Sequence, residues 1–298
     1  MKYLILSDIH SNREALGAVV SFVRRKPWDK AVCLGDIVGY GANPNQTVDM
    51  LRKLRPLAAV RGNHDKVCSG LEDGELFNRI ALEAAMWTRR KLTRPNMRWL
   101  RGLPQGPVEV DGRFAICHGT PIDEDAYIFG EIEALNVFRH TEYPICFFGH
   151  SHFPVIFALS PDAITTILTV APSFRFKLRE GVRYLINPGS VGQPRDGNPL
   201  TSFALFDSGS RTVTIHRIPY QIEATQEKIL KAGVRYLINP GSVGQPRDGN
   251  PLTSFAIYDS DSKWVTIHRI PYRIEATQEK ILKAGLPRPL ADRLAIGR

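Results

Sequence analysis

Short apolar runs recur at intervals through the first half of the chain. Each has about four hydrophobic residues without polar alternation, which is typical of strands buried on both faces. Segments with helical apolar spacing lie between several of these runs, the clearest being 13–24, 46–54 and 78–92. The alternation predicts a layered α/β domain. The predicted strands are Tyr3–Leu6, Ala31–Leu34, Leu57–Val60, Phe114–Cys117 and Ile145–Phe148.

The second half of the chain contains a tandem repeat. Residues 182–233 recur almost unchanged as 234–285. Each copy predicts a strand, a Pro/Gly-rich loop, a hairpin and a helix, because polar and apolar residues alternate over 212–218 and an amphipathic pattern follows over 222–231. The copies differ at Leu205/Ile257, Phe206/Tyr258, Gly209/Asp261, Arg211/Lys263, Thr212/Trp264 and Gln221/Arg273.

Two copies are fewer than a stackable repeat array normally needs, which is about three or more. We therefore expect residues 1–298 to form a single domain in which one copy is surplus to the fold. The surplus copy would pack outside, stay loosely ordered or insert into a second subunit, and the last option predicts a homo-oligomer formed by swapping. Which copy occupies the sheet, and the oligomeric state, stay open at this point.

Composition places the chain among ordinary globular proteins. It has 298 residues, of which 43% are hydrophobic and 23% charged. No apolar run approaches the roughly 20 residues that span a bilayer, and the start at Met1–Leu6 is too short for a signal peptide. We expect a cytoplasmic protein without a membrane partner. Cys33, Cys117 and Cys146 lie in apolar runs and are expected to be reduced and buried.

The formal charge of +9 favours anionic ligands. The basic clusters at 24–26, 52–55 and 89–91 fall in or beside segments with helical spacing, and no aromatic residues are interleaved with them. Solvated helix faces explain them better than a nucleic-acid surface. A nucleic-acid partner is therefore not expected.

Side chains that bind metals follow every predicted strand. In open α/β sheets the carboxyl ends of the strands form the crevice where ligands bind, so residues scattered in sequence should converge there. Each short motif alone would more often be a capping turn or polar loop, and only their joint occurrence points to a metal site. His216 and His268 fall on the polar side of a strand pattern and are expected at the surface. The residues at the strand ends are Asp8, His10, Asp36, Asn63, His64, His118, His150 and His152.

Such a set suits the hydrolysis of phosphate esters. Two metal ions about 3.5–4 Å apart can generate hydroxide at neutral pH and neutralise charge on the phosphoryl oxygens. Mixed Asp, His and Asn ligands favour Mn, Fe, Ni, Co or Zn over Ca or Mg, which prefer oxygen ligands alone. The sequence thus predicts an enzyme with two divalent metal ions.

These motifs, in this order, resemble those of the calcineurin-like metallophosphoesterases. The resemblance spans the first half of the chain, and Asn187–Ser190 is a further, less specific similarity. It implies a two-sheet αββα sandwich and attack by a metal-bound hydroxide. It also implies that Asp8, His10 and His152 hold one ion, that Asn63, His118 and His150 hold the other, that Asp36 bridges them, and that His64 faces the leaving group. The motifs are Asp8-Ile9-His10, Gly35-Asp36, Gly62-Asn63-His64-Asp65, His118 and Gly149-His150-Ser151-His152.

One departure from the family bears on the substrate. Protein phosphatases of this family carry Asp-Arg after Gly-Asp, whereas Ile37–Gly41 contains neither. Without that guanidinium a doubly charged monoester loses more binding than a diester does, which favours a phosphodiesterase acting on a small ester such as a nucleotide. Tyr40 could then stack on the substrate or hydrogen-bond to it. The alternatives are a phosphomonoesterase or protein phosphatase with the same metals, and a non-catalytic scaffold; natural substrate and metal identity stay open.

Overall fold

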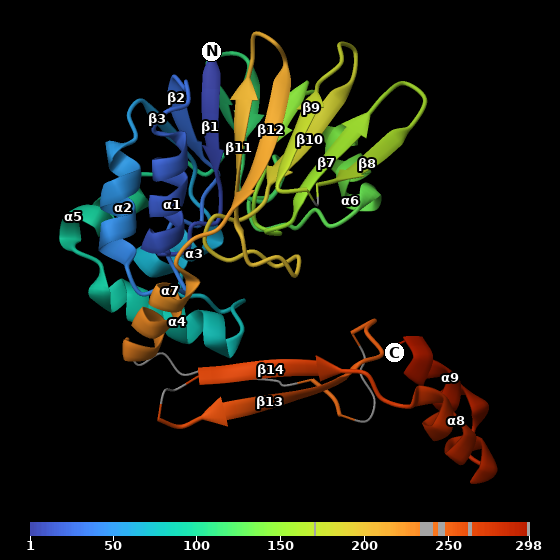
Figure 1. Cartoon of the computed structure of the whole chain (residues 1–298). Helices are drawn as coiled ribbons and strands as arrows, with labels where there is room; N and C mark the ends of the chain where they lie inside the picture. Colours follow the sequence, from blue (N-terminus) through green and yellow to red (C-terminus); the bar gives the residue numbers. More distant parts are fainter. Residues whose placement is uncertain (170, 233–240, 244–247, 262–263, 297–298) are drawn as a thin grey trace. The chain divides into compact units, whose positions relative to one another are not determined.

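The computed structural model describes residues 1–169, 171–232, 241–243, 248–261 and 264–296. Contacts divide the chain into two units, Met1–Val234 and Arg235–Arg298. The described part of the first unit holds two six-stranded sheets, and that of the second holds a two-stranded sheet and two helices (Figure 1).

The first sheet has the strand order β3-β2-β1-β11-β12-β9. Its three strands from the start of the chain run parallel, and β11 joins β1 antiparallel with Leu4 opposite Leu205. Parallel neighbours need crossover connections, which α1 (Arg13–Val23) and α2 (Pro44–Lys53) supply. The strands are β1 (Lys2–Leu6), β2 (Lys30–Cys33), β3 (Leu57–Ala59), β9 (Ser173–Lys177), β11 (Thr201–Asp207) and β12 (Thr212–Ile218).

The second sheet has the order β4-β5-β6-β10-β7-β8. Its central strands β5, β6 and β10 are parallel, while β4, β7 and β8 pair antiparallel with their neighbours. The strands are β4 (Val108–Val110), β5 (Phe114–Ile116), β6 (Ile145–Phe147), β7 (Pro154–Leu159), β8 (Ile164–Leu168) and β10 (Arg183–Pro188).

Helices cover the outer faces of both sheets. On the side of the first sheet, α1 packs against α2, α7 and β11, and on the side of the second, α6 packs against β7 and β8 (Figure 1). The first unit is therefore a two-sheet sandwich flanked by helices, as the family resemblance of the motifs implies. The further helices are α3 (Asn63–Ser69), α4 (Arg79–Lys91), α5 (Arg94–Arg101), α6 (Glu131–His140) and α7 (Ile222–Lys231).

Three hydrophobic clusters correspond to the three interfaces between layers. On β1, Tyr3 and Ile5 face the core between the two sheets, while Leu4 and Leu6 face the core beneath the helices. Both sets are fully buried, which is why β1 reads as an uninterrupted apolar run. A third cluster, including Phe138 and Phe157, lies between α6 and the second sheet.

The prediction that His216 is a surface residue is wrong. Its side chain is buried, its ring lies 5.1 Å from Phe22 and 5.4 Å from Phe203, and its Nδ1 lies 3.2 Å from the Ser173 hydroxyl. The alternation along β12 suggested a solvated face, but α1 covers that face of the sheet. The repeat counterpart, His268, is partly buried against Phe255.

The first repeat copy supplies β10, β11, β12 and α7 to the sandwich. The second copy supplies a hairpin, β13 (Thr253–Asp259) and β14 (Trp264–Ile270), with the same register as β11 and β12. It continues into α8 (Ile274–Lys283), and α9 (Arg288–Ile296) packs on α8 beyond the repeat. The segment 235–240, which corresponds to β10, lies outside the described residues.

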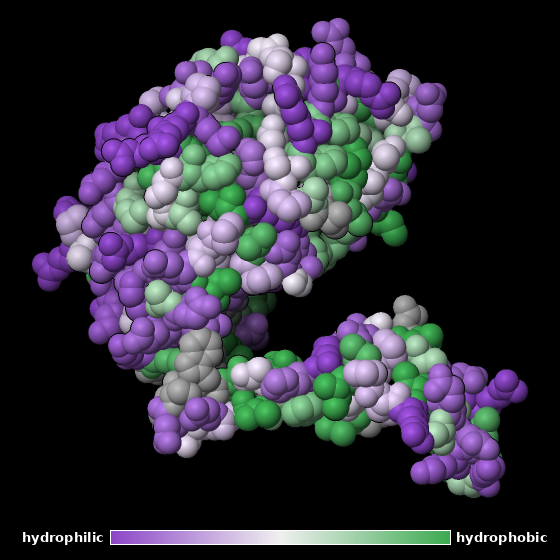
Figure 2. All heavy atoms as spheres, viewed as in Figure 1, coloured by the Kyte–Doolittle hydropathy of each residue, from purple (hydrophilic) through white to green (hydrophobic). Residues whose placement is uncertain are grey.

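The two hairpins differ in burial although their sequences nearly match. Phe206 and Ile215 are 1% exposed, whereas their counterparts Tyr258 and Ile267 are 59% and 51% exposed. Figure 2 shows hydrophobic side chains at the surface of the second copy's hairpin. Phe206 packs its ring among aromatic side chains of the inter-sheet core. A tyrosine there would bury a hydroxyl, at a cost of about 1–3 kcal/mol if it found no partner, so we propose that this difference favours the first copy.

Deleting either copy tests the proposal that one is surplus. Removal of 234–285 is expected to leave the melting temperature of the first unit nearly unchanged. Removal of 182–233 forces Tyr258 into the core. This deletion should lower the melting temperature by several degrees, since 1 kcal/mol corresponds to about 2–4 °C at this size. Tyr258→Phe in the second deletion should restore part of the loss. Circular dichroism melting measures all three, and unfolding caused by removal of 234–285 would contradict the proposal.

No helix within the described ranges is long and apolar enough to cross a membrane. All four cysteines, Cys33, Cys68, Cys117 and Cys146, are buried and free of disulfides.

Candidate metal centre

The structure brings the side chains at the strand ends together. Asp8 and His10 follow β1, Asp36 follows β2, and Asn63 begins α3 just after β3. His118 follows β5, and His150 and His152 lie between β6 and β7. The strands β1, β2 and β3 are parallel in the first sheet, and β5 and β6 are parallel in the second. Their carboxyl ends therefore meet at one edge of the sandwich. All of these residues except Asn63 are at least 96% buried.

Ligand atoms form two groups that share one carboxylate. Asp8, His10, Asp36 and His152 make up the first group, and Asp36, His118 and His150 make up the second. Within each group these atoms lie within 4.8 Å of one another. Asn63 joins the second group, since its Oδ1 lies 3.2 Å from the Nε2 of His118.

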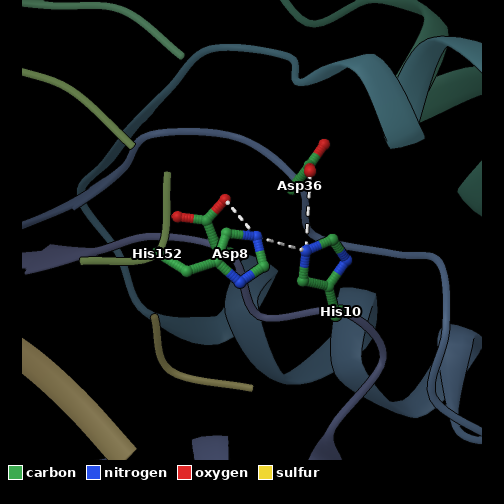
Figure 3. Close-up of side chains that lie close together, drawn as sticks. All are labelled: Asp8, His10, Asp36 and His152. Atoms are coloured by element: carbon green, nitrogen blue, oxygen red, sulfur yellow. Dashed lines mark hydrogen bonds and ion pairs between the residues drawn. The ribbon is translucent and has the colours of Figure 1, made fainter. Parts of the chain in front are cut away.

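The first group is shown in Figure 3, where four side chains point toward one another. The Nε2 atoms of His10 and His152 are 3.2 Å apart. The Nε2 of His10 lies 3.5 Å from a carboxylate oxygen of Asp36, and the Nε2 of His152 lies 3.4 Å from one of Asp8. In the second group, the Nε2 of His118 lies 3.4 Å from the same Asp36 oxygen, Oδ2.

The backbone at the centre is held in an unusual conformation. Asp8, His10, Asp36, His150 and His152 all have positive φ, between 48° and 66°. Left-handed backbone costs a non-glycine residue about 1–2 kcal/mol, and such residues cluster at functional sites. The fold therefore retains this strain at five positions to aim these side chains inward.

Three of the four imidazoles in the cluster place their Nδ1 against a backbone carbonyl. The Nδ1 atoms of His10, His118 and His152 lie 3.3, 2.8 and 2.6 Å from backbone carbonyl oxygens. A carbonyl only accepts, so each Nδ1 donates and, when the ring is neutral, each Nε2 presents a lone pair. Those lone pairs face one another and carboxylate oxygens. A cluster in which acceptors face acceptors at 3.2–3.5 Å fits a bound cation.

In place of a metal ion, a proton on His118 would balance the negative charge of Asp36. Burial lowers the pKa of His118, but the carboxylate of Asp36 and the hydrogen bond to it outweigh burial and raise that pKa to about 10. Burial is the main cause that lowers the pKa of His10 and His152, and it lowers that of His150 to about 3. A metal ion would displace the single proton, because ligands bind metals in their deprotonated form.

Residues that the sequence analysis left without a role hold the centre in place. Asp65 accepts hydrogen bonds from the backbone N–H groups of Ile37, Val38 and Gly62, at 2.9, 3.1 and 3.0 Å. Burial raises the pKa of Asp65 to about 7, and the charge of Asp36 adds to this effect. Asp65 thus ties the loop that carries Asp36 to the one that carries Asn63.

The Asn187–Ser190 segment supports the opposite side. Asn187 donates its side-chain amide to the Gly149 carbonyl at 2.8 Å, and the Ser190 hydroxyl donates to the Asp8 carbonyl at 2.8 Å. A Cβ on Gly192 would lie 1.8 Å from the Ile9 carbonyl oxygen, so only glycine fits there. The loop after β10 is therefore built against the loop after β1.

A pocket of about 400 Å³ opens beside the cluster. His64 lines it and is 4% exposed, with its ring centroid 4.5 Å from those of both Tyr40 and Phe77. Asp36 Oδ1 accepts a hydrogen bond from the His64 backbone N–H at 2.9 Å. Burial lowers the pKa of His64 to about 4, although Asp36 opposes this. Tyr40 also lines the pocket, together with Tyr127 and Arg195, which the sequence did not single out.

A two-sheet sandwich with a buried Asp/His cluster at one edge is the arrangement that the family resemblance of the motifs implies. The sequence profile of the calcineurin-like phosphoesterase superfamily domain matches residues 1–211. The chain belongs to this family, as its motifs indicate.

Similar proteins come from archaea and bacteria. The chain is 38% identical over 231 residues to the uncharacterized protein MJ0912 of Methanocaldococcus jannaschii, covering 76% of this chain and 91% of that one. The crystal structure of a metallophosphoesterase from Sphaerobacter thermophilus is 32% identical, with a TM-score of 0.63 and coverage of 100% and 99%. The hypothetical protein PH1004 of Pyrococcus horikoshii shares the fold, with a TM-score of 0.63 at 19% identity and coverage of 78% and 94%.

Proposed function

We propose that this chain hydrolyses phosphate esters with two divalent metal ions. The main support is that one carboxylate, Asp36, belongs to both groups of candidate ligands. A shared carboxylate suits a pair of ions held close together. Two such ions would supply a hydroxide at neutral pH and neutralise charge on the phosphoryl oxygens.

The ligand assignment follows the two groups. Asp8, His10 and His152 would hold one ion; the Nε2 of His152 lies 3.2 Å from that of His10 and 3.4 Å from a carboxylate oxygen of Asp8. Asn63, His118 and His150 would hold the other, and Asp36 would bridge the two. Nitrogen and oxygen donors of this kind suit Mn, Fe, Co, Ni or Zn. The carbonyls that accept from the Nδ1 atoms orient three of the rings before any ion binds.

His64 would act on the leaving group. It lines the pocket beside Asp36 but belongs to neither group of candidate ligands. Gly39 makes room for the ring, since a Cβ there would lie 2.6 Å from the His64 Nδ1. From this position the imidazole can donate a proton or a hydrogen bond to the departing oxygen, which stabilises its developing charge.

Aromatic side chains at the pocket suit a planar group on the ester. Tyr127 stacks on His150 with ring centroids 3.7 Å apart, and on Phe129 at 5.0 Å. Phe129 is 65% exposed, so the stack extends into solvent. Together with Tyr40 these rings support a nucleotide-like substrate. Stacking of a base on an aromatic ring contributes about 1–3 kcal/mol.

Phosphodiesters are the proposed substrates, because Ile37–Gly41 lacks the arginine that would clamp a dianion. Arg195 in the pocket favours a second candidate, phosphomonoester hydrolysis with the same metals. Diester and monoester hydrolysis are distinguished by comparing kcat/KM on bis(4-nitrophenyl) phosphate with kcat/KM on 4-nitrophenyl phosphate, with Mn²⁺ and the same protein concentration. A higher value on the diester is expected. A higher value on the monoester would overturn the diester proposal, and turnover of neither would favour a scaffold role.

A further inference from the structure

Arg195 enters the pocket from a segment remote from every candidate metal ligand in sequence. It lies in the loop between β10 and β11, its side chain is exposed, and it lines the same pocket as Asp36, His64 and His152. The loop is fixed at its base, because the Ser190 hydroxyl donates to the Asp8 carbonyl and accepts from the backbone N–H of Gln193. The guanidinium is therefore presented by a supported loop rather than by a free one.

No acidic residue neutralises this guanidinium. Arg195 donates a hydrogen bond to Gln193 Oε1 at 3.0 Å, and within the described ranges of the chain no carboxylate forms an ion pair with it. The adjacent Asp196 pairs with Arg217 instead. A guanidinium has five N–H donors in a planar fork that matches phosphate oxygens. A cation at a pocket wall without an acidic partner is suited to an anionic ligand.

Two tyrosines, Tyr40 and Tyr127, line the pocket together with Arg195. Tyr40 comes from the loop after β2 and Tyr127 from the loop before α6. Three separate loops thus converge on one pocket.

The guanidinium also shares its pocket with the metal cluster. Asp36, His150 and His152, three of the candidate ligands, line the same pocket as Arg195. A phosphoryl group held at the cluster would therefore lie within the field of Arg195.

Building on the proposed phosphoesterase function, we infer that Arg195 binds the substrate phosphoryl group and selects doubly charged groups over singly charged ones. From the loop after β10, this contact offsets part of the dianion binding that is lost because Ile37–Gly41 has no arginine. A doubly charged phosphoryl group gains more from this contact, because charge-assisted hydrogen bonds strengthen with charge on the acceptor. This selection is measured as the ratio of kcat/KM on a monoester to kcat/KM on a diester. Arg195 raises that ratio whichever class of ester the wild-type protein hydrolyses faster.

Kinetics of Arg195→Ala test the inference. We expect kcat/KM on 4-nitrophenyl phosphate to fall about 10- to 100-fold, the equivalent of one charged hydrogen bond, and kcat/KM on bis(4-nitrophenyl) phosphate to fall less than about 3-fold. Arg195→Lys should recover part of the loss, and so should added guanidinium ion. An equal fall in kcat/KM on both esters, or no fall on either, would overturn the inference.

A binding measurement keeps the inference testable if the chain hydrolyses neither ester. Isothermal titration at pH 8 compares inorganic phosphate, which is mainly a dianion, with dimethyl phosphate, a monoanion, on metal-loaded protein. Arg195→Ala should weaken phosphate binding about 10- to 100-fold and leave dimethyl phosphate nearly unchanged. Unchanged phosphate affinity would refute the role of Arg195 whatever the catalytic result.

The repeat supplies a matched control. Arg247 occupies the position of Arg195 in the second copy, within identical neighbouring sequence, and lies outside the described residues. Arg247→Ala is expected to leave the ester ratio and the phosphate affinity at wild-type values, and the double variant to behave as Arg195→Ala. A shift in the ratio caused by Arg247→Ala alone would contradict the assignment to Arg195.

Discussion

Replacing Asp36 by asparagine is expected to lower metal-dependent ester hydrolysis by at least about 1,000-fold, since the charge stabilisation at stake is several kcal/mol. Asp36 Oδ2 lies 3.5 Å from His10 Nε2 and 3.4 Å from His118 Nε2, one in each group of candidate ligands. Asparagine keeps the size of the side chain and an oxygen for the His64 backbone N–H. It removes the negative charge that two ions would share.

The Asp36→Asn variant should fold, which makes its activity interpretable. Asp36 has a φ of 51°, and asparagine is among the residues that tolerate left-handed backbone best. Bound metal, counted by mass spectrometry of the digested protein, should fall together with activity. Asp49→Asn, an exposed carboxylate on α2, is the matched control and should change neither. Full activity in Asp36→Asn would remove the bridging role from the account.

Replacing His64 by alanine is expected to lower kcat about 100- to 1,000-fold, a usual range for loss of a catalytic proton donor, while metal content stays the same. The loss should depend on the leaving group. Diphenyl phosphate, whose phenolate is a poor leaving group, should suffer more than bis(4-nitrophenyl) phosphate, whose leaving group needs little protonation. This dependence follows from the place of His64 in the pocket beside Asp36.

The control for His64 is His140, an exposed residue at the end of α6 whose Nδ1 lies 2.8 Å from the Asn136 carbonyl. His140→Ala should leave kcat and metal content unchanged. Loss of metal from His64→Ala would show instead that His64 only orients Asn63. Equal losses on both esters would argue against an action on the leaving group.

The site could be predicted from sequence where strand topology alone determines position. Parallel strands end at one edge of a sheet, so a residue just past each of several buried strands must lie near the others. Asp8, Asp36 and His118 follow such strands, and their apolar runs are unambiguous because both faces of each sheet are covered. The same coverage explains the error at His216, since a polar alternation does not reveal a helix packed over it.

Arg195, Tyr127 and Asp65 could not be placed in this way. They lie in loops or at a helix start, where no periodicity fixes the direction of a side chain, and their positions depend on contacts between segments far apart in sequence. Asp65 reaches Ile37 and Val38 from 28 and 27 residues away. For Arg195 the sequence did hold one signal, the Pro/Gly-rich stretch that follows a predicted strand. In the structure, Gly192 of this stretch leaves no room for a side chain.

The most direct test of the account is a titration of metal-free protein with Mn²⁺, in which bound ions and hydrolysis of bis(4-nitrophenyl) phosphate are measured in the same samples. A centre of two ions bridged by Asp36 should show no turnover without metal, turnover that rises as the second ion binds, and saturation at two ions per chain. Full turnover by the metal-free protein, or saturation at a single ion with full activity, would contradict a paired metal centre bridged by Asp36.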